Sequence, residues 1–246
     1  MAATRHFTFD LTGALAEQLD SALPTLIPAP LTMSQLQQVD TVPGIYQLYL
    51  DGDLVYVGKA DRSLRARLSD HHRKISGRLN INVADMTFTG LYLEGTWIPV
   101  GPEQMLIKRR ENQGIKPPWN FNGFGINDPG KERDTTNFGS EHFDVLYPAD
   151  LDYPLTRIGP GQPLASELLP QLKRELPYIF RYENQWAKHP DYLASHVTVV
   201  QSAPTAAQLF GALITALPAG WQITALPGYV IMYKQLRNYP SSRRVW

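Results

Sequence analysis

The sequence of 246 residues contains no cysteine. A disulfide framework, a cysteine-based zinc site and a thiol nucleophile are therefore excluded. The sequence also lacks a run of about 20 apolar residues, which is the length that spans a membrane, and it does not start with the apolar run of a signal peptide. These absences predict a soluble, cytoplasmic protein without a membrane partner.

The chain has no excess of either charge, since 23 basic side chains balance 23 acidic ones. Any binding of DNA must then depend on local basic patches. Residues 59–78 form one such patch, with seven lysines and arginines against two aspartates. A run of this kind is compatible with a solvated helix face and equally with a surface that contacts phosphate groups.

Hydrophobic periodicity predicts a mixed α+β chain without internal repeats. In the first 150 residues we expect helices at 8–22, 63–75 and 102–112, and strands at 45–50, 54–57 and 86–93. Residues 117–150 are rich in proline, glycine and asparagine and are expected to form a long functional loop. In the last third we expect helices at 164–176 and 205–217, a strand at 196–201, and a hairpin of strands 221–226 and 229–233.

The stretch GIYQLYLDGDLVYVGKA at residues 44–60 predicts a hairpin around the pair Asp51-Gly52. Whether Tyr46 and Tyr56 lie on the same face depends on the register of the two strands. A two-residue turn would place them on opposite faces. A three-residue loop, with Gly52 as a left-handed bulge, would place Tyr46 opposite Tyr56. We predict this second register.

The order of motifs along the chain resembles the GIY-YIG nuclease superfamily. The motifs are Gly44-Ile45-Tyr46, Tyr56-Val57-Gly58, Arg67 with His71 on the next predicted helix, Glu103 opening another helix, and Asn120 in the sequence PPWN. The stretches PPWNFNGFGINDPGKER and HFDVLYP are similar to one branch, the type II restriction endonucleases that cut CCGCGG. The similarity spans roughly residues 8–150, and the rest of the chain has no recognised counterpart.

The resemblance implies an α+β fold with a small three-stranded antiparallel sheet flanked by helices. The nuclease domain would cover residues 1–150, with its core at 40–125 and an N-terminal helical arm. Residues 151–246 are expected to form an accessory α+β lobe that serves DNA recognition or dimerisation.

The resemblance also implies roles for individual side chains. Tyr46 would act as, or help to position, the general base for water, Arg67 would stabilise the attacked phosphate, and Glu103 would hold a single divalent cation, Mg²⁺ or Mn²⁺. The predicted catalytic set consists of Tyr46, Tyr56, Lys59, Arg67, His71, Glu103 and Asn120.

These residue types suit phosphodiester hydrolysis. Arg67 and His71 are four residues apart and so share a helix face, from which a guanidinium can bind phosphate oxygens. A phenol with a pKa of about 10 is a poor base unless nearby cations lower that pKa, so Tyr46 needs Arg67, Lys59 or the metal. Lys59 fits a phosphate contact and a solvated turn equally well. The Asp-x-Lys or Glu-x-Lys pattern of other restriction nucleases is absent.

Double-stranded DNA is the expected partner, and a homodimer is expected because each subunit of this branch cuts one strand of a palindrome. The side chains predicted to bind DNA are Arg65, Arg73, Lys74, Asn122, Asn127, Lys131 and Arg133. No motif identifies a companion methyltransferase. Two alternatives are a structure-specific or modification-dependent GIY-YIG nuclease in repair or phage defence, and an inactive DNA-binding module. The presence of every catalytic motif residue argues against the inactive module.

Overall fold

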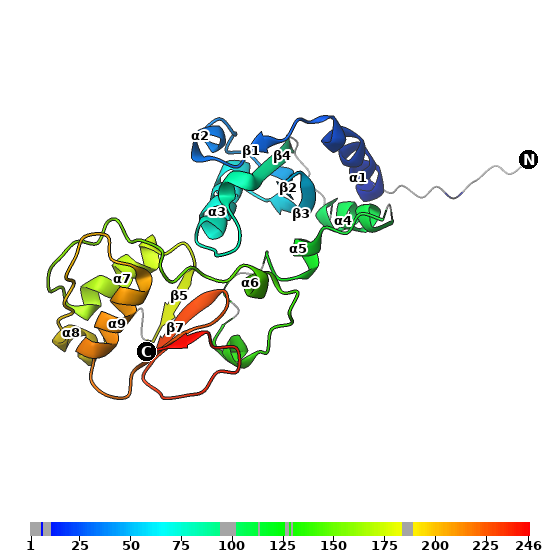
Figure 1. Ribbon diagram of the computed structural model, residues 1–246. Coiled ribbons are helices and arrows are strands. Elements are labelled where there is room, and N and C mark those ends of the chain that lie inside the picture. The colour runs from blue at the N-terminus through cyan, green and yellow to red at the C-terminus, as the bar shows by residue number, and fades with distance from the viewer. Residues whose placement is uncertain are drawn as a thin grey trace, which may run out of the picture. The chain divides into compact units, whose positions relative to one another are not determined.

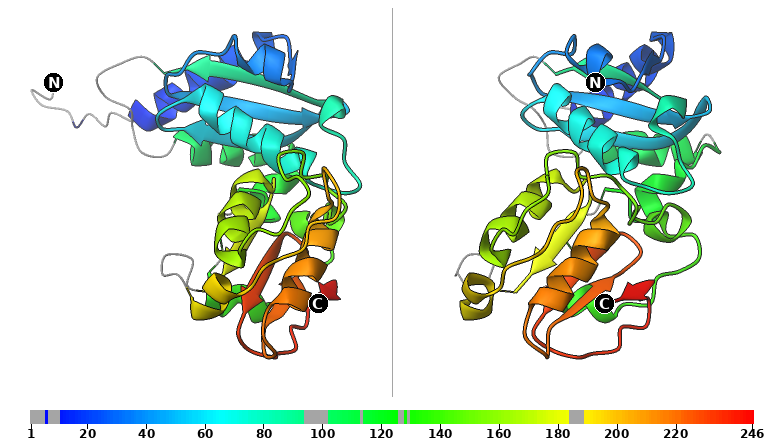
Figure 2. Two further views of the ribbon diagram at one scale, coloured as in Figure 1. Left: turned by 90° about the vertical axis from the view of Figure 1, so that its left-hand side faces the viewer. Right: turned by 60° about the vertical axis from the view of Figure 1, so that its left-hand side comes forward.

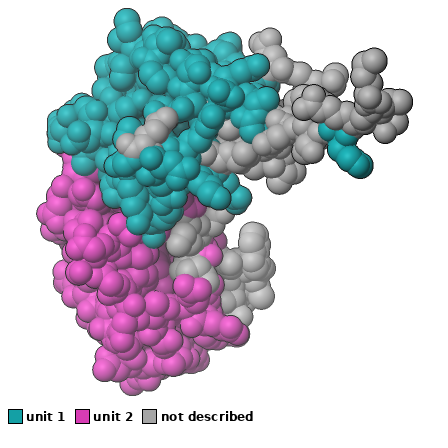
Figure 3. Space-filling model, turned by 90° about the vertical axis from the view of Figure 1, so that its right-hand side faces the viewer, with its two compact units in different colours: residues 1–72, 83–121 teal, residues 73–82, 122–246 magenta. Residues whose placement is uncertain are grey.

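The computed structural model describes residues 6, 11–93, 102–112, 114–125, 128, 130–183 and 189–246. The chain divides into two compact units (Figure 3). Unit 1 comprises Met1–His72 and Val83–Phe121, and unit 2 comprises Arg73–Asn82 and Asn122–Trp246. None of the helices described is long and apolar enough to span a bilayer.

Unit 1 is built on a four-stranded antiparallel sheet in the order β1-β4-β2-β3 (Figure 1). Its strands are β1 (Ala29–Pro30), β2 (Gly44–Leu50), β3 (Asp53–Ala60) and β4 (Met86–Tyr92). The resemblance implied three strands, and the short β1 adds a fourth because Ala29 pairs with Phe88 of β4. Proline is tolerated in this strand because β1 lies at the edge of the sheet. The mixed α+β class is confirmed.

Helices cover both faces of this sheet (Figure 2). The helices of unit 1 are α1 (Leu11–Ala22), α2 (Met33–Leu36), α3 (Leu64–Ser76, ending in unit 2), α4 (Pro102–Asn112) and α5 (Pro118–Phe121), with short 3-10 turns at Leu23–Thr25 and Val83–Asp85. Ile45 of β2 and Val57 of β3 are buried in one cluster with residues of α1 and α4. The opposite face, which carries Tyr46, contacts α3 through His71.

The β2–β3 hairpin closes with a two-residue turn, so the predicted three-residue loop is wrong. Asp51 and Gly52 both have positive φ, 51° and 90°, and Leu50 pairs directly with Asp53. Two consecutive left-handed residues match the twist of a hairpin, and aspartate tolerates this conformation better than most side chains. Gly52 is left-handed as expected, but it belongs to the turn and is not a bulge.

A bulge inside β3 restores the shared face of the two tyrosines. The register shifts between Leu48 and Tyr49 of β2, and Val55 of β3 has no partner in the pairing. Beyond this bulge Tyr46 pairs with Gly58, and Leu48 pairs with Tyr56. Because alternate residues of a strand share a face, Tyr46 and Tyr56 lie on the same side of the sheet.

Unit 2 contains a second four-stranded sheet, in the order β5-β7-β6-β8. Its strands are β5 (Ile179–Tyr182), β6 (Gln222–Ala225), β7 (Tyr229–Tyr233) and β8 (Arg244–Val245), and its helices are α6 (Phe143–Leu146), α7 (Ala165–Glu175), α8 (Pro190–Ala194) and α9 (Ala206–Ala216), with a 3-10 turn η3 (Lys131–Thr135). β5 runs parallel to β7, and the other pairs are antiparallel. Side chains of α7 and α9 share a buried core with one face of this sheet.

The sequence pattern misplaced one strand of unit 2. Residues 196–201 form isolated bridges, Leu164 with His196 and Gly161 with Val199, and not the predicted strand. β5 takes the place beside β7 instead. Unit 2 also includes residues 122–150, and the end of the nuclease domain at residue 150 stays a prediction.

Candidate active site

The hydroxyl of Tyr46 is held between two side chains of α3. It lies 2.6 Å from Nε2 of His71 and accepts a hydrogen bond of 3.2 Å from Nε of Arg67. Tyr46 is fully buried and His71 is 3% exposed, whereas Arg67 is half-buried. The pairing of β2 fixes the tyrosine, and the four-residue spacing on α3 aims both partners at one oxygen.

Tyr56 completes this group of side chains. Its ring centroid lies 6.1 Å from that of Tyr46 and 5.6 Å from that of His71. Burial lowers the pKa of the Arg67 guanidinium. The interactions with the Tyr46 and Tyr56 hydroxyls raise the same pKa by a larger amount, so its net shift is upward. Arg67 therefore keeps its positive charge at neutral pH, and it is suited to bind an anion.

Gly58 leaves the space that the Tyr46 ring occupies. A Cβ atom on Gly58 would overlap the ring and the hydroxyl of Tyr46, and it would come within 2.7 Å of Cε1 of Tyr56. This contact follows directly from the register, since Gly58 is paired with Tyr46. The structure shows that Gly58 makes room for the central tyrosine of the site.

We expect Gly58→Ala to lower the rate of the reaction at this site by roughly 10²-fold, because the added methyl group must displace the Tyr46 hydroxyl. The comparison is Gly139→Ala, where a Cβ meets no atom within 4 Å. Thermal unfolding of both variants separates the effect on the site from a loss of stability. Equal activities of the two folded variants would show that Gly58 has no role in positioning Tyr46.

The side chain of Asn120 in α5 forms hydrogen bonds with the backbone of β3 at the edge of the sheet. Its Oδ1 accepts from the backbone N–H of Val57 at 2.9 Å, and its Nδ2 donates to the carbonyl of Val57 at 2.8 Å. β3 is an edge strand, so these outward-facing backbone groups have no neighbouring strand to bind. Asn120 thereby fixes the part of β3 between Tyr56 and Gly58. Its direct participation in catalysis stays a prediction.

Residues 55–150 match the family model described as the Eco29kI GIY-YIG domain. This segment resembles a GIY-YIG domain of a restriction endonuclease. The resemblance predicted from the motifs is thus confirmed. The match includes Tyr56, Arg67 and His71, whereas Tyr46 precedes it. A search among curated proteins found no match for the chain.

Glu103 and Lys59 are the two remaining members of the predicted catalytic set. Glu103 lies in the first turn of α4, but its side chain is outside the described part of the structure. Within the described residues, no group of three or more histidine, aspartate or glutamate side chains could hold a metal ion. Lys59 forms a 2.8 Å ion pair with the exposed Asp61.

Three of the predicted DNA-binding side chains bind backbone carbonyl groups of the protein. Nε of Arg65 donates to the carbonyl of Val39 at 2.5 Å, in unit 1. In unit 2, Arg73 donates to the carbonyls at the end of α7, and Lys74 donates to the carbonyl of Phe124. These contacts are structural, and DNA contacts by the same side chains stay predictions.

The other predicted DNA-binding residues lie in the segment after α5. The backbone carbonyl of Asn122 accepts from the N–H of Phe143 at 2.7 Å. Lys131 and Arg133 lie in η3 with exposed side chains. Asn127 lies outside the described residues.

No signal in the sequence indicates that Asp134, beside Lys131 and Arg133, is buried. Asp134 is 1% exposed and accepts two hydrogen bonds from Arg181 of β5, at 2.8 and 3.1 Å. A single aspartate in a loop is normally solvated, and nothing in its local sequence identifies its partner, which lies 47 residues further along the chain.

Proposed function

We propose that this protein is a type II restriction endonuclease that hydrolyses phosphodiester bonds of double-stranded DNA at a fixed sequence. The observation that carries the proposal is the Tyr46 hydroxyl held between Arg67 and His71. The match of residues 55–150 to a restriction-endonuclease GIY-YIG domain supports it. An arginine, a histidine and a phenol at hydrogen-bonding distance supply what phosphoryl transfer to water requires, namely proton transfer and charge stabilisation.

The hydrogen-bonding capacity of the Tyr46 hydroxyl assigns its role. A phenol oxygen has one hydrogen to donate and can accept further hydrogen bonds. Arg67 donates to this oxygen, and in the tautomer that leaves Nε2 of His71 without a proton the phenol hydrogen is directed to that nitrogen. Tyr46 takes a proton from the attacking water as it passes its own to His71. The resulting hydroxide attacks phosphorus, and the leaving oxygen departs with a proton from solvent.

Arg67 stabilises the negative charge that develops on the attacked phosphate. Nε of Arg67 donates to Tyr46, the Tyr56 hydroxyl also hydrogen-bonds to the guanidinium, and the guanidinium is half-buried. Its Nη groups can bind phosphate oxygens in the paired geometry that guanidinium groups favour. A Mg²⁺ or Mn²⁺ ion held by Glu103, one per site, would neutralise further charge on the phosphate.

Glu103→Gln tests the metal assignment. We expect this variant to need at least about tenfold more Mg²⁺ for half-maximal cleavage, because a neutral amide is a much weaker ligand for a hard cation. The control is Glu111→Gln, which removes a carboxylate from the exposed end of the same helix. An unchanged Mg²⁺ dependence in Glu103→Gln would show that another group holds the metal.

Digestion of unmodified plasmid DNA with Mg²⁺, followed by sequencing of the ends, tests the proposed function. A homodimer acting on a palindrome cuts both strands in one binding event, so we expect discrete ends and linear product without accumulated nicked circles. Cleavage restricted to branched or damaged substrates would favour a repair nuclease instead. Cleavage restricted to modified DNA would favour a modification-dependent enzyme, in which residues 151–246, outside the matched segment, would read the modification.

A further inference from the structure

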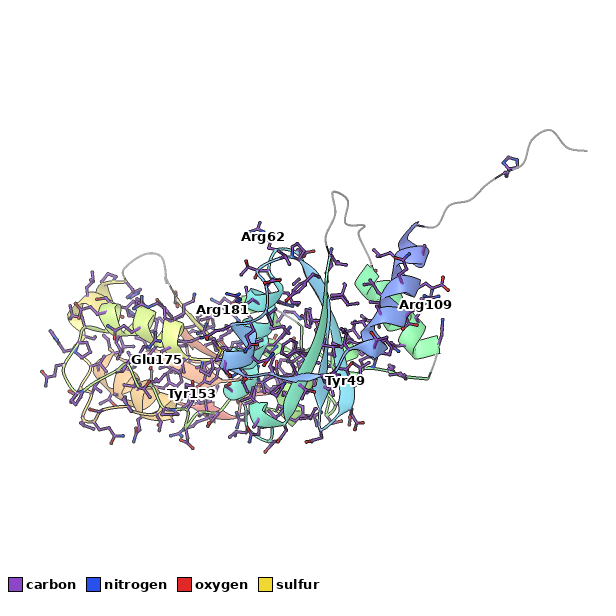
Figure 4. All side chains as sticks on the ribbon, turned by 90° about the horizontal axis from the view of Figure 1, so that it is seen from above. Tyr49, Arg62, Arg109, Tyr153, Glu175 and Arg181 are labelled. Carbon is purple, nitrogen blue, oxygen red and sulfur yellow. The ribbon has the colours of Figure 1, made fainter. Side chains whose placement is uncertain are left out.

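The segment of unit 2 that carries Lys131 and Arg133 is fastened to the second sheet by a buried polar network. Arg181 of β5 (Figure 4) donates to both oxygens of Asp134, at 2.8 and 3.1 Å. The hydroxyls of Tyr229 and Tyr233, both on β7, donate to the same carboxylate at 3.0 and 3.1 Å. The charge of Asp134 is thus compensated inside the protein, where it does not offset cations at the surface.

The C-terminal segment 234–246 reaches the same face of this sheet through Tyr239. It contains four basic side chains and no acidic side chain. Tyr239 is buried in one cluster with Tyr229, Tyr233 and Phe138. Oγ of Ser241 donates to the carbonyl of Thr136 at 2.9 Å. Two segments about one hundred residues apart in sequence therefore form one continuous surface.

The two segments carry six exposed cations. Three of them are engaged elsewhere, since Lys234 pairs with Asp191, Arg243 donates to the carbonyl of Ala149, and Arg244 lies over the ring of Trp246. The other three are Lys131, Arg133 and Arg237. Nζ of Lys131 lies 4.5 Å from the ring centroid of Tyr233, and the guanidinium of Arg237 lies 5.7 Å from that of Tyr239. Arg133 is exposed in η3. Aromatic rings beneath Lys131 and Arg237 orient the side chains while leaving their charges accessible. We call Lys131, Arg133 and Arg237 the basic triplet.

We propose that the basic triplet binds the phosphate backbone of duplex DNA, and that Asp134 and Arg181 are positioning residues for this surface. The inference rests on the proposed function, since the partner is the DNA that the active site cuts. It gives residues 151–246 a function, because Arg181, Tyr229, Tyr233 and Arg237 all lie beyond the matched segment. Lys131 and Arg133, within that segment, are held in place by strands outside it.

The test is the salt dependence of DNA binding, measured by fluorescence anisotropy with the full chain and a labelled duplex in the absence of Mg²⁺. The variant carries Lys131→Ala, Arg133→Ala and Arg237→Ala. Each lost phosphate contact lowers the slope of log K against log salt by about 0.9, so we expect a decrease of about 2 to 3. The matched control removes three exposed cations on the α7 side, through Arg157→Ala, Lys173→Ala and Arg174→Ala. Its slope should stay within about 0.5 of the wild-type value.

Asp134→Asn, made alone and in the triple variant, tests the positioning role. Alone, it should lower the slope, because the triplet loses its fixed geometry; in the triple variant it should change the slope no further. A general loss of structure would weaken binding in both backgrounds and would overturn the role of Asp134. Equal slopes for the triple variant and its control would overturn the proposal as a whole. Failure of the wild type to cut any DNA would instead refute the proposed function.

Discussion

Arg67→Lys should lower the single-turnover rate of DNA cleavage by about 10³-fold while the affinity for the duplex changes little. Lysine keeps the positive charge but loses the planar fork of donors, so it cannot hold the Tyr46 oxygen and a phosphate at the same time. The same contacts with Tyr46 and Tyr56 account for the raised pKa of Arg67, because they raise it by more than burial lowers it. Single-turnover kinetics at saturating DNA measures the effect on chemistry separately from binding.

Arg109→Lys provides the matched control, because it makes the same substitution on α4 of the same unit. Nη2 of Arg109 lies 4.0 Å from a carboxylate oxygen of Glu17 on α1, at the limit of an ion pair. We expect the cleavage rate of this control to remain within about twofold of the wild-type rate, as surface ion pairs contribute little. If Arg67→Lys were equally active, the arginine would not bind the attacked phosphate.

Tyr46→Phe should lower the cleavage rate by roughly 10² to 10⁴-fold, which is the usual range for loss of a general base. The ring still fits over Gly58, but the hydroxyl that joins Arg67 to His71 is removed. The buried His71 then lacks this partner, and we expect the free energy of unfolding to fall by about 1 to 3 kcal/mol. Chemical denaturation measures the stability, and single-turnover cleavage measures the rate.

Tyr49→Phe, three residues further along β2, is the control for this substitution. The Tyr49 hydroxyl donates to Oε1 of Gln47 at 2.7 Å, and Tyr49 and Tyr46 lie on opposite faces of the sheet because they are three residues apart on β2. Removal of this hydroxyl should affect stability but leave the cleavage rate within about threefold of wild type, since it takes no part in the proposed proton transfer. Comparable losses of rate in the two variants would mean that the Tyr46 hydroxyl has no special role.

The strands and helices around the site were predictable because their signals are local. Asp51-Gly52 specified a hairpin, and the i, i+4 spacing placed Arg67 and His71 on one face of α3. The register was not predictable, because the bulge at Val55 arises from pairing with β2 and has no glycine or proline to announce it. The turn and the bulge each shift the pairing by one residue from the predicted register. The combined shift of two residues leaves both tyrosines on one face, although Tyr46 pairs with Gly58 and not with Tyr56.

Long-range contacts account for most of what the sequence could not indicate. The pairing of Asn120 with Val57 joins residues 63 apart, and that of Asp134 with Arg181 joins residues 47 apart. Each residue type alone is typical of a solvated loop or an exposed strand. The isolated bridges at 196–201 show the converse case, in which an apolar stretch lacks the strand partner that its pattern implied.

The central claim is that the Tyr46 hydroxyl between Arg67 and His71 belongs to a site that cuts DNA. The most direct measurement compares end-mapped plasmid cleavage by the wild type, Tyr46→Phe and Tyr49→Phe under single-turnover conditions with Mg²⁺. We predict the same discrete ends for the wild type and Tyr49→Phe, and almost no product with folded Tyr46→Phe. Cleavage by Tyr46→Phe at the wild-type rate, or a wild type that cuts no DNA, would contradict the claim.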